Sequence, residues 1–367
     1  MAGDALSPAA PLPAAAAAAV AAAGVAAAAN AAVLAPLGAH RLDLRLFDLR
    51  PSALLRSGHL QSLLGSLPPI ALLARRRAAA LLAAAQPLLL DCADGVRLQA
   101  FHSRAAGARR LAVLLHGWEG SAQSSSVLSL AALLYRSGYH VLRLNLRDHG
   151  GSQALNREIF HSCRLSDVVG ALRAIAQCFD ATPLYLAGFS LGGNFMLRAA
   201  ADAGLPAAVR GVVAVSPVLE PAATLLALEH GPPLYRRNLV RRWSRSLRAK
   251  QRAWPGVHDF SELLRLSDLR RMTAGLVRSQ TQFADLEAYL QGYAITGERL
   301  TGLRTRCSVL LAEDDPLIPI ADVHRLAFSP SLAVWCSRYG GHCGFLPRLG
   351  LPTAADSFVL EQFEAFG

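Results

Sequence analysis

The sequence predicts an α/β fold, in which a mostly parallel sheet of about eight strands carries helices on both faces and a helical cap insertion. From residue 87 onward, short apolar runs alternate with segments of helical spacing, a pattern typical of parallel strands joined by helices. The alternation is interrupted roughly from residue 220 to residue 305, where the sequence shows helical patterns without strand-like runs. The chain has 367 residues, 53% hydrophobic and 17% charged, so it can bury one large core.

The predicted strands are short runs rich in Val and Leu. A run that is apolar throughout, such as LAVLLH, indicates a strand buried on both faces of a sheet. The first two predicted strands flank the turn Ala93-Asp94-Gly95. The strands are expected at residues 87–92, 96–101, 111–116, 139–146, 184–189, 211–217, 307–315 and 332–337.

The predicted helices lie between these strands and after the last one. The segment 124–136 ends before Gly138, and the segment 164–179 repeats apolar residues at helical spacing. Two more helices are predicted over 191–203 and 354–366. Because ligands of open α/β sheets bind outside the carboxyl ends of the strands, functional side chains are expected directly after each strand.

Residues 188–192, Gly-Phe-Ser-Leu-Gly, match the motif G-x-S-x-G between a predicted strand and a predicted helix. In α/β-hydrolases this motif is the nucleophile elbow, a sharp turn that raises a serine hydroxyl above the sheet. The turn crowds the positions two residues before and after the serine, where Gly188 and Gly192 fit. We therefore expect Ser190 to be a nucleophile. The alternative is a tight turn in which Ser190 only caps the helix.

A nucleophilic serine needs two backbone N–H groups to stabilise the oxyanion of its tetrahedral intermediate. The first is expected from Leu191, directly after the nucleophile, and the second from the loop after the third strand. That loop reads His116-Gly117-Trp118-Glu119-Gly120, and the N–H of Trp118 is the candidate. An ordinary glycine-rich turn is the alternative for this loop.

The carboxylate that orients the base is expected between Ser190 and the histidine, because the chain order in this fold is Ser, acid, His. After Ser190, the residues Glu313, Asp314 and Asp315 end the predicted strand at 307–315. Asp315 is preferred because the others precede the turn that Pro316 imposes, and Asp314 is second. A solvated acidic turn is the alternative.

The base is expected after the final strand, where His342 stands in the loop Gly-Gly-His-Cys-Gly. Glycines on both sides let this loop carry an imidazole across the top of the sheet. His324 is the other histidine after Asp315, and it lies in a predicted helix over 321–327 that favours a structural role. No histidine spacing supports a metal site.

The serine turn, the His-Gly loop, the acidic turn and the histidine loop occur in an order and at spacings that resemble the YheT-like family of α/β-hydrolase fold serine hydrolases. This family is related to the alpha/beta-hydrolase-domain lipases. The resemblance covers roughly residues 45–367 and departs at NLRDHGGS, where relatives often carry F-R-G. It implies an ester hydrolase without metal or organic cofactor, whose nucleophile, acid and base fall on Ser190, Asp315 and His342. The matching stretches are SGHLQSLL (57–64), LLHGWEGSAQS (114–124), NLRDHGGS (145–152), FHSCRLSDV (160–168), GFSLGGN (188–194), EDDPLIP (313–319) and GGHCGF (340–345).

The formal net charge of +11 comes almost entirely from arginine, and many of these arginines cluster within residues 236–252 of the predicted cap. Three interpretations are a solvated helix, a surface for anionic lipid or an acidic acyl substrate, and a nucleic-acid site. We favour the first and expect no nucleic-acid partner. An apolar stripe that includes Leu239, Trp243 and Leu247 is expected to face the catalytic pocket or the sheet edge.

The N-terminal residues form a separate unit in this interpretation. Residues 14–35 are almost entirely Ala, so residues 1–40 are predicted to be a low-complexity tail and residues 41–367 the hydrolase domain, with the cap at about 220–305. A membrane anchor and a start codon placed too far upstream are the alternatives. Six cysteines without a C-x-x-C spacing favour a reducing, cytoplasmic location, with membrane association through the Ala-rich segment as the alternative.

The functional prediction is a serine carboxylic-ester hydrolase that acts on a small-molecule ester or lipid-like substrate. It requires Ser190, Asp315 and His342 to meet over the tips of one sheet. The alternative is a non-catalytic α/β-hydrolase scaffold that binds lipid or a partner.

Overall fold

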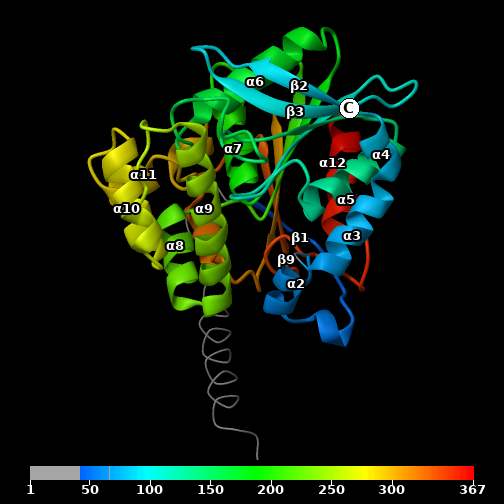
Figure 1. Cartoon of the computed structure of the whole chain (residues 1–367). Helices are drawn as coiled ribbons and strands as arrows, with labels where there is room; N and C mark the ends of the chain where they lie inside the picture. The colour runs from blue at the N-terminus through cyan, green and yellow to red at the C-terminus, as the bar shows by residue number, and fades with distance from the viewer. Residues whose placement is uncertain (1–41, 66) are drawn as a thin grey trace, which may run out of the picture. The chain divides into compact units, whose positions relative to one another are not determined.

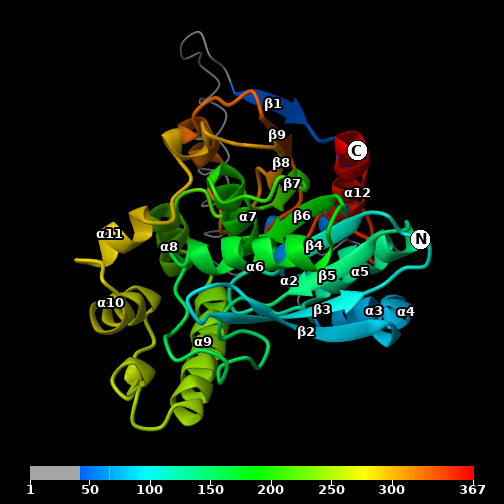
Figure 2. The same cartoon turned by 90° about the horizontal axis from the view of Figure 1, so that it is seen from above.

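The computed structural model describes residues 42–65 and 67–367, and these contain one nine-stranded sheet with helices on both faces (Figures 1 and 2). The predicted tail at residues 1–40 lies outside the described residues. The strands are β1 (Asp43–Leu46), β2 (Ala85–Asp91), β3 (Arg97–Ser103), β4 (Leu111–Leu115), β5 (His140–Leu144), β6 (Leu184–Phe189), β7 (Val209–Val215), β8 (Arg306–Ala312) and β9 (Leu332–Ser337).

The strands lie in the order β1-β9-β8-β7-β6-β4-β5-β3-β2. β3 runs antiparallel to both of its neighbours, and every other neighbouring pair is parallel. The carboxyl ends of β4, β6, β8 and β9 therefore lie at one edge of the sheet, where the functional residues were expected. The predicted fold class, a mostly parallel sheet with helices around it, is confirmed.

Two helical layers cover the sheet, because its central strands are apolar on both faces. Along β4, Leu111, Val113 and Leu115 face one buried cluster, while Ala112 and Leu114 face the other. The first cluster contains α6 and α7, and the second contains α3, α4, α5 and α12. The helices of the two layers are α3 (Pro68–Arg77), α4 (Ala79–Ala83), α5 (Ser125–Arg136), α6 (Leu165–Cys178), α7 (Leu191–Ala201) and α12 (Ala354–Phe366). The short helix α2 (Gly58–Leu64) precedes α3 and contributes no residue to either cluster.

The segment between β7 and β8 forms helices that pack beside the sheet (Figure 2). Leu225, Trp243, Leu247 and Met272 belong to an apolar cluster of its own. The helices, which together are called the cap below, are α8 (Pro221–His230), α9 (Pro233–Ala253), α10 (Leu269–Gln280) and α11 (Leu286–Gln291).

A buried ion pair ties α9 to the main domain. Lys250 Nζ lies 2.8 Å from Asp148 Oδ1 and also donates to the carbonyl oxygens of Asn156 and Glu158 at 2.6 and 3.1 Å. Burial without such partners would be costly for an ammonium group. The contact thus fixes the cap against the loop that follows β5.

Several elements differ from the sequence prediction. The additional strand β1 pairs with β9 at the sheet edge, and α2 to α4 were not predicted. The helix expected over 321–327 is a 3-10 helix, Ile320–Arg325. Within the part of the chain that the structure describes, no helix is both long and apolar enough to cross a bilayer.

Candidate active site

Ser190 lies at the turn from β6 to α7 with φ 52° and ψ −120°, a conformation that is strained for a residue with a side chain. Close backbone contacts explain the two glycines of the motif. A Cβ at Gly192 would lie 2.4 Å from the carbonyl oxygen of His116, and one at Gly188 would lie 2.4 Å from the carbonyl of Gly192. The elbow therefore packs directly against the end of β4.

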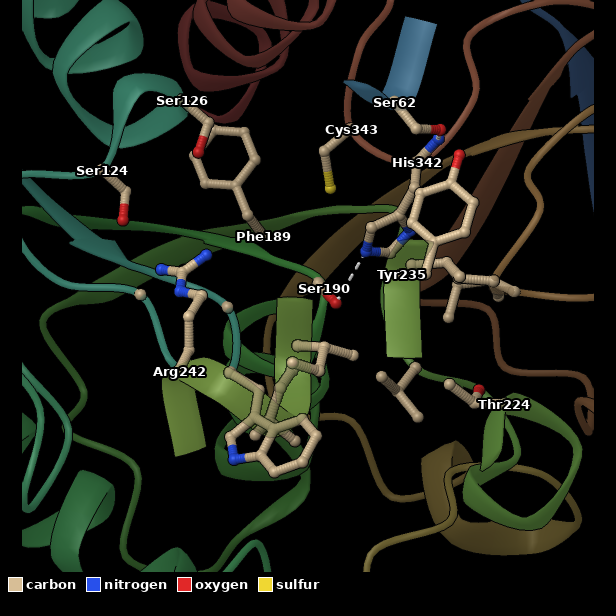
Figure 3. Close-up of a pocket in the computed structure, with 18 of the residues that line it drawn as sticks. Ser62, Ser124, Ser126, Phe189, Ser190, Thr224, Tyr235, Arg242, His342 and Cys343 are labelled. Atoms are coloured by element: carbon tan, nitrogen blue, oxygen red, sulfur yellow. Dashed lines mark hydrogen bonds between the residues drawn. The ribbon is translucent and has the colours of Figure 1, made fainter. Parts of the chain in front are cut away.

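His342 reaches Ser190 from the loop after β9. Its Nε2 lies 2.9 Å from Ser190 Oγ (Figure 3). The adjacent Gly341 has φ 53°, and a Cβ there would lie 2.2 Å from the carbonyl oxygen of Gly58 in α2. The backbone N–H of His342 donates to Ser62 Oγ at 2.7 Å, so α2 supports the loop that carries the imidazole.

Asp315 is the carboxylate that meets the imidazole. Its Oδ2 lies 3.0 Å from His342 Nδ1, while Oδ1 accepts the N–H groups of Leu317 and Ile318 at 2.8 and 3.0 Å. The carboxylate can only accept, so Nδ1 carries the proton and Nε2 is free to accept from Ser190. The Asp315 side chain is 1% exposed, which keeps this interaction out of solvent.

Asp314, the second candidate for the acid, has a different place. Its Oδ1 accepts the backbone N–H of Gly341 at 2.8 Å and its Oδ2 has no partner in the described residues. Burial, with a contribution from the charge of Asp315, raises the pKa of Asp314 to about 6. The structure thus brings Ser190, His342 and Asp315 together and leaves Asp314 as a support of the histidine loop.

The loop expected to supply an oxyanion donor passes over Ser190. A Cβ at Gly117 would lie 3.2 Å from Ser190 Cβ, so only glycine allows this approach without displacement. The backbone N–H groups of Trp118 and Leu191 have no acceptor within residues 42–65 and 67–367. Both N–H groups therefore lack a hydrogen-bond partner within these residues.

Two buried histidines hold this loop in place. His149 Nε2 accepts the N–H of Glu119 at 3.2 Å, and His149 Nδ1 lies 2.7 Å from the carbonyl oxygen of Arg147. His116 Nδ1 lies 2.7 Å from the carbonyl oxygen of Gly117. Burial and the neighbouring His149 lower the pKa of His116 to about 3, so it stays neutral and can act as a fixed donor.

A cavity of about 600 Å³ opens above Ser190 and His342. Its outer wall comes largely from the cap, and it is mainly apolar, with Trp118 packed against Trp243 at 5.2 Å between ring centroids. The predicted stripe does reach this cavity, because Leu239 and Trp243 line it. The cap residues that line it include Leu225, Leu228, Leu239, Arg242, Trp243, Leu269, Thr273 and Leu276.

Helix α2 supports the histidine loop, a role that was not predicted from the sequence. Gln61 is fully buried there, donating to the carbonyl oxygens of Leu55 and Leu346 and accepting the N–H of Leu346 at 2.7 Å. The hydroxyl oxygen of Tyr235, a cap residue, lies 3.2 Å from His59 Nδ1 of α2. The sequence signal for this support was the block SGHLQSLL, which matches the family but contains no recognisable catalytic or metal-binding motif.

No group of three or more His, Cys, Asp or Glu side chains in the described chain could hold a metal ion.

The family model described as alpha/beta hydrolase fold matches residues 112–347, and these residues make up more than half of the chain. The chain belongs to the alpha/beta hydrolase fold family. Within it, the chain is 26% identical over 271 residues to the putative esterase YheT of Escherichia coli, covering 69% of this chain and 77% of that protein. The predicted resemblance to YheT-like hydrolases is confirmed.

Other relatives of this family are longer than the matched region. The chain is 26% identical to human protein ABHD15, covering 65% of this chain and 52% of that protein. It is 21% identical to mouse phospholipase ABHD3, covering 66% of this chain and 59% of that protein. Among solved structures, a bacterial membrane phospholipase A aligns with a TM-score of 0.54 at 16% identity, over 81% of this chain and 92% of that one. The Pyrococcus furiosus esterase Pf2001 aligns with a TM-score of 0.51 at 14% identity, over 77% of this chain and 92% of that one. At these identities, the solved structures show the fold alone.

Proposed function

We propose that this protein is a serine hydrolase that cleaves carboxylic esters through an acyl-enzyme intermediate. Ser190 is the nucleophile, His342 the general base and Asp315 the carboxylate that orients the imidazole. The observation that carries the proposal is the hydrogen-bond chain from Ser190 Oγ to His342 and from His342 to Asp315, at 2.9 and 3.0 Å.

In the first half of the reaction, Ser190 Oγ attacks the ester carbonyl carbon as its proton passes to His342 Nε2. The carbonyl oxygen becomes an oxyanion that accepts the unengaged N–H groups of Trp118 and Leu191. The carbon–oxygen bond to the alcohol then breaks, and the alcohol leaves with the proton from His342. The acyl group remains on Ser190.

In the second half, His342 takes a proton from water while the water oxygen attacks the acyl carbon. The same two N–H groups receive the second oxyanion. Ser190 Oγ then leaves the acyl carbon and recovers its proton from His342, releasing the carboxylic acid. Asp315 keeps Nδ1 protonated throughout and stabilises the imidazolium that forms twice.

The cavity supports a small-molecule ester or a lipid-like ester as substrate. Its volume of about 600 Å³ suits a ligand of moderate size, and leucines of the cap offer an apolar wall for an acyl chain. The names of the relatives, an esterase and a phospholipase, agree with this substrate class.

The test is hydrolysis of 4-nitrophenyl butyrate by wild type and by Ser190→Ala. We expect kcat to fall by on the order of 10⁴-fold or more in the variant, because no other group can form the acyl-enzyme. Ser279→Ala is the matched control, since that hydroxyl is exposed on α10 and bonds only within its own helix. A Ser190→Ala rate within about tenfold of wild type would refute the proposal.

A further inference from the structure

Arg242 lines the candidate active-site cavity from α9, and it is the one Lys or Arg among the described lining residues. In Figure 3 its side chain extends into the cavity with Ser124 on one side of Ser190, while His342 and Tyr235 lie on the other. A substrate bound in this mainly apolar cavity therefore lies near the permanent positive charge of the Arg242 guanidinium.

No carboxylate neutralises this charge within residues 42–65 and 67–367. Arg242 Nη2 donates to the carbonyl oxygen of Glu119, but no ion pair forms with any acid of the described chain. The Glu119 carboxylate accepts Ser246 Oγ instead, at 2.7 Å. Asp356, the carboxylate that lines the cavity, accepts Ser129 Oγ at 2.6 Å and the N–H of Thr353 at 2.8 Å.

The remaining N–H donors of the Arg242 guanidinium have no acceptor among the residues that the structure describes. An arginine presents five N–H donors in a planar fork that matches two oxygens of a carboxylate or phosphate. The solvated-helix interpretation accounts for Arg237, Arg241 and Arg245, which are exposed along α9, but not for the half-buried Arg242. The orientation of Arg242 thus needs an explanation of its own.

We propose that Arg242 binds an anionic group of the substrate, a carboxylate or a phosphate that lies within the same molecule as the cleaved bond. That the ligand is an ester rests on the proposed function; that the cavity binds an anion does not. Arg242 is a specificity-determining residue in this account, because it selects charged over neutral esters without taking part in bond cleavage.

The first experiment compares matched esters in wild type, Arg242→Gln and Arg242→Lys. One pair is 4-nitrophenyl hexanoate and mono-4-nitrophenyl adipate, and the other is dihexanoylglycerol and its 3-phosphate. We expect the charged-to-neutral ratio of kcat/KM to fall at least about tenfold in Arg242→Gln for one pair, and less in Arg242→Lys. A fall for the adipate pair assigns a carboxylate, and a fall for the other pair assigns a phosphate.

The ratio separates anion binding from a role in holding the loop through Glu119. Loss of loop positioning lowers kcat/KM for both members of a pair and leaves their ratio unchanged, which would overturn the inference. Arg245→Gln is the matched control, because it removes the same charge from an exposed position on the same helix. Its ratio should stay at the wild-type value.

The second experiment does not depend on catalysis. Trp118 and Trp243 line the cavity, so their fluorescence reports its occupation during titration with hexyl phosphate and with hexanoate. We expect at least one anion to bind about tenfold more weakly to Arg242→Gln than to wild type or Arg245→Gln. Equal affinities in all three proteins overturn the inference. Arg242-dependent binding in a protein that hydrolyses no ester upholds the inference and refutes the proposed function.

Discussion

Asp315→Asn tests the proton arrangement of the candidate site, because the structure dictates how the amide must turn. Oδ1 of Asp315 accepts two backbone N–H groups, from Leu317 and Ile318, at 2.8 and 3.0 Å. The amide oxygen must stay at that position, so the NH₂ group faces His342 Nδ1, which lies 3.0 Å from Oδ2 in the wild type. An amide nitrogen only donates, so Nδ1 becomes the acceptor and the ring proton moves to Nε2.

The size of the effect follows from the wrong tautomer. With a proton on Nε2, His342 presents a donor to Ser190 across the 2.9 Å contact and cannot accept the hydroxyl proton. This tautomer change in a Ser-His-Asp triad lowers kcat about 10⁴-fold, or about 5 kcal/mol of transition-state stabilisation. The fold should hold, because the two backbone hydrogen bonds remain.

The assay is kcat for a short aryl ester, with thermal unfolding measured in parallel. Asp314→Asn is the matched control, because its Oδ1 still accepts the N–H of Gly341 and its Oδ2 has no partner to lose in the described residues. We expect that variant to lose less than about tenfold in kcat. A large loss of kcat in Asp314→Asn, together with a small loss in Asp315→Asn, would show that Asp314 and not Asp315 orients His342.

Two further predictions concern stability, and urea unfolding measures both. Gly192→Ala should cost about 3 kcal/mol, since its Cβ would lie 2.4 Å from a backbone oxygen, whereas Gly302→Ala, with nothing within 4 Å, should change stability by less than about 0.5 kcal/mol. Equal effects would show that the elbow is not closely packed. Lys250→Met should cost about 3–5 kcal/mol, because it leaves Asp148 buried without its partner. The exposed Arg248→Met on the same helix is its control, and an equal loss there would contradict the role given to the ion pair.

The central sheet could be predicted because its strands are buried on both faces and therefore read as continuous apolar runs. The edge strand β1 could not, since all four of its residues are exposed and carry no burial pattern. Helix α2 was missed for a different reason. It supports the histidine loop through Ser62 Oγ, which accepts the N–H of His342, and through the Gln61 side chain, which bonds to the backbone of Leu346. Ser and Gln side chains that bond to a backbone form no recognisable catalytic or metal-binding pattern in a sequence.

At the candidate site, the motif and the chain order led to Ser190, His342 and a carboxylate of the acidic turn. The choice between Asp314 and Asp315 depends on which side chain faces the imidazole, and adjacent residues differ in direction rather than in chemistry. Arg242 posed the same problem, because one arginine among many on α9 turns into the cavity. Composition records how many charges a helix has but not which of them is turned inward.

The most direct test of the proposed nucleophile is mass spectrometry after treatment with a fluorophosphonate. We expect one covalent adduct per chain, located by peptide mapping on Ser190, and no adduct in the folded Ser190→Ala protein. An adduct on a different residue, or none on the folded wild-type protein, would contradict that expectation.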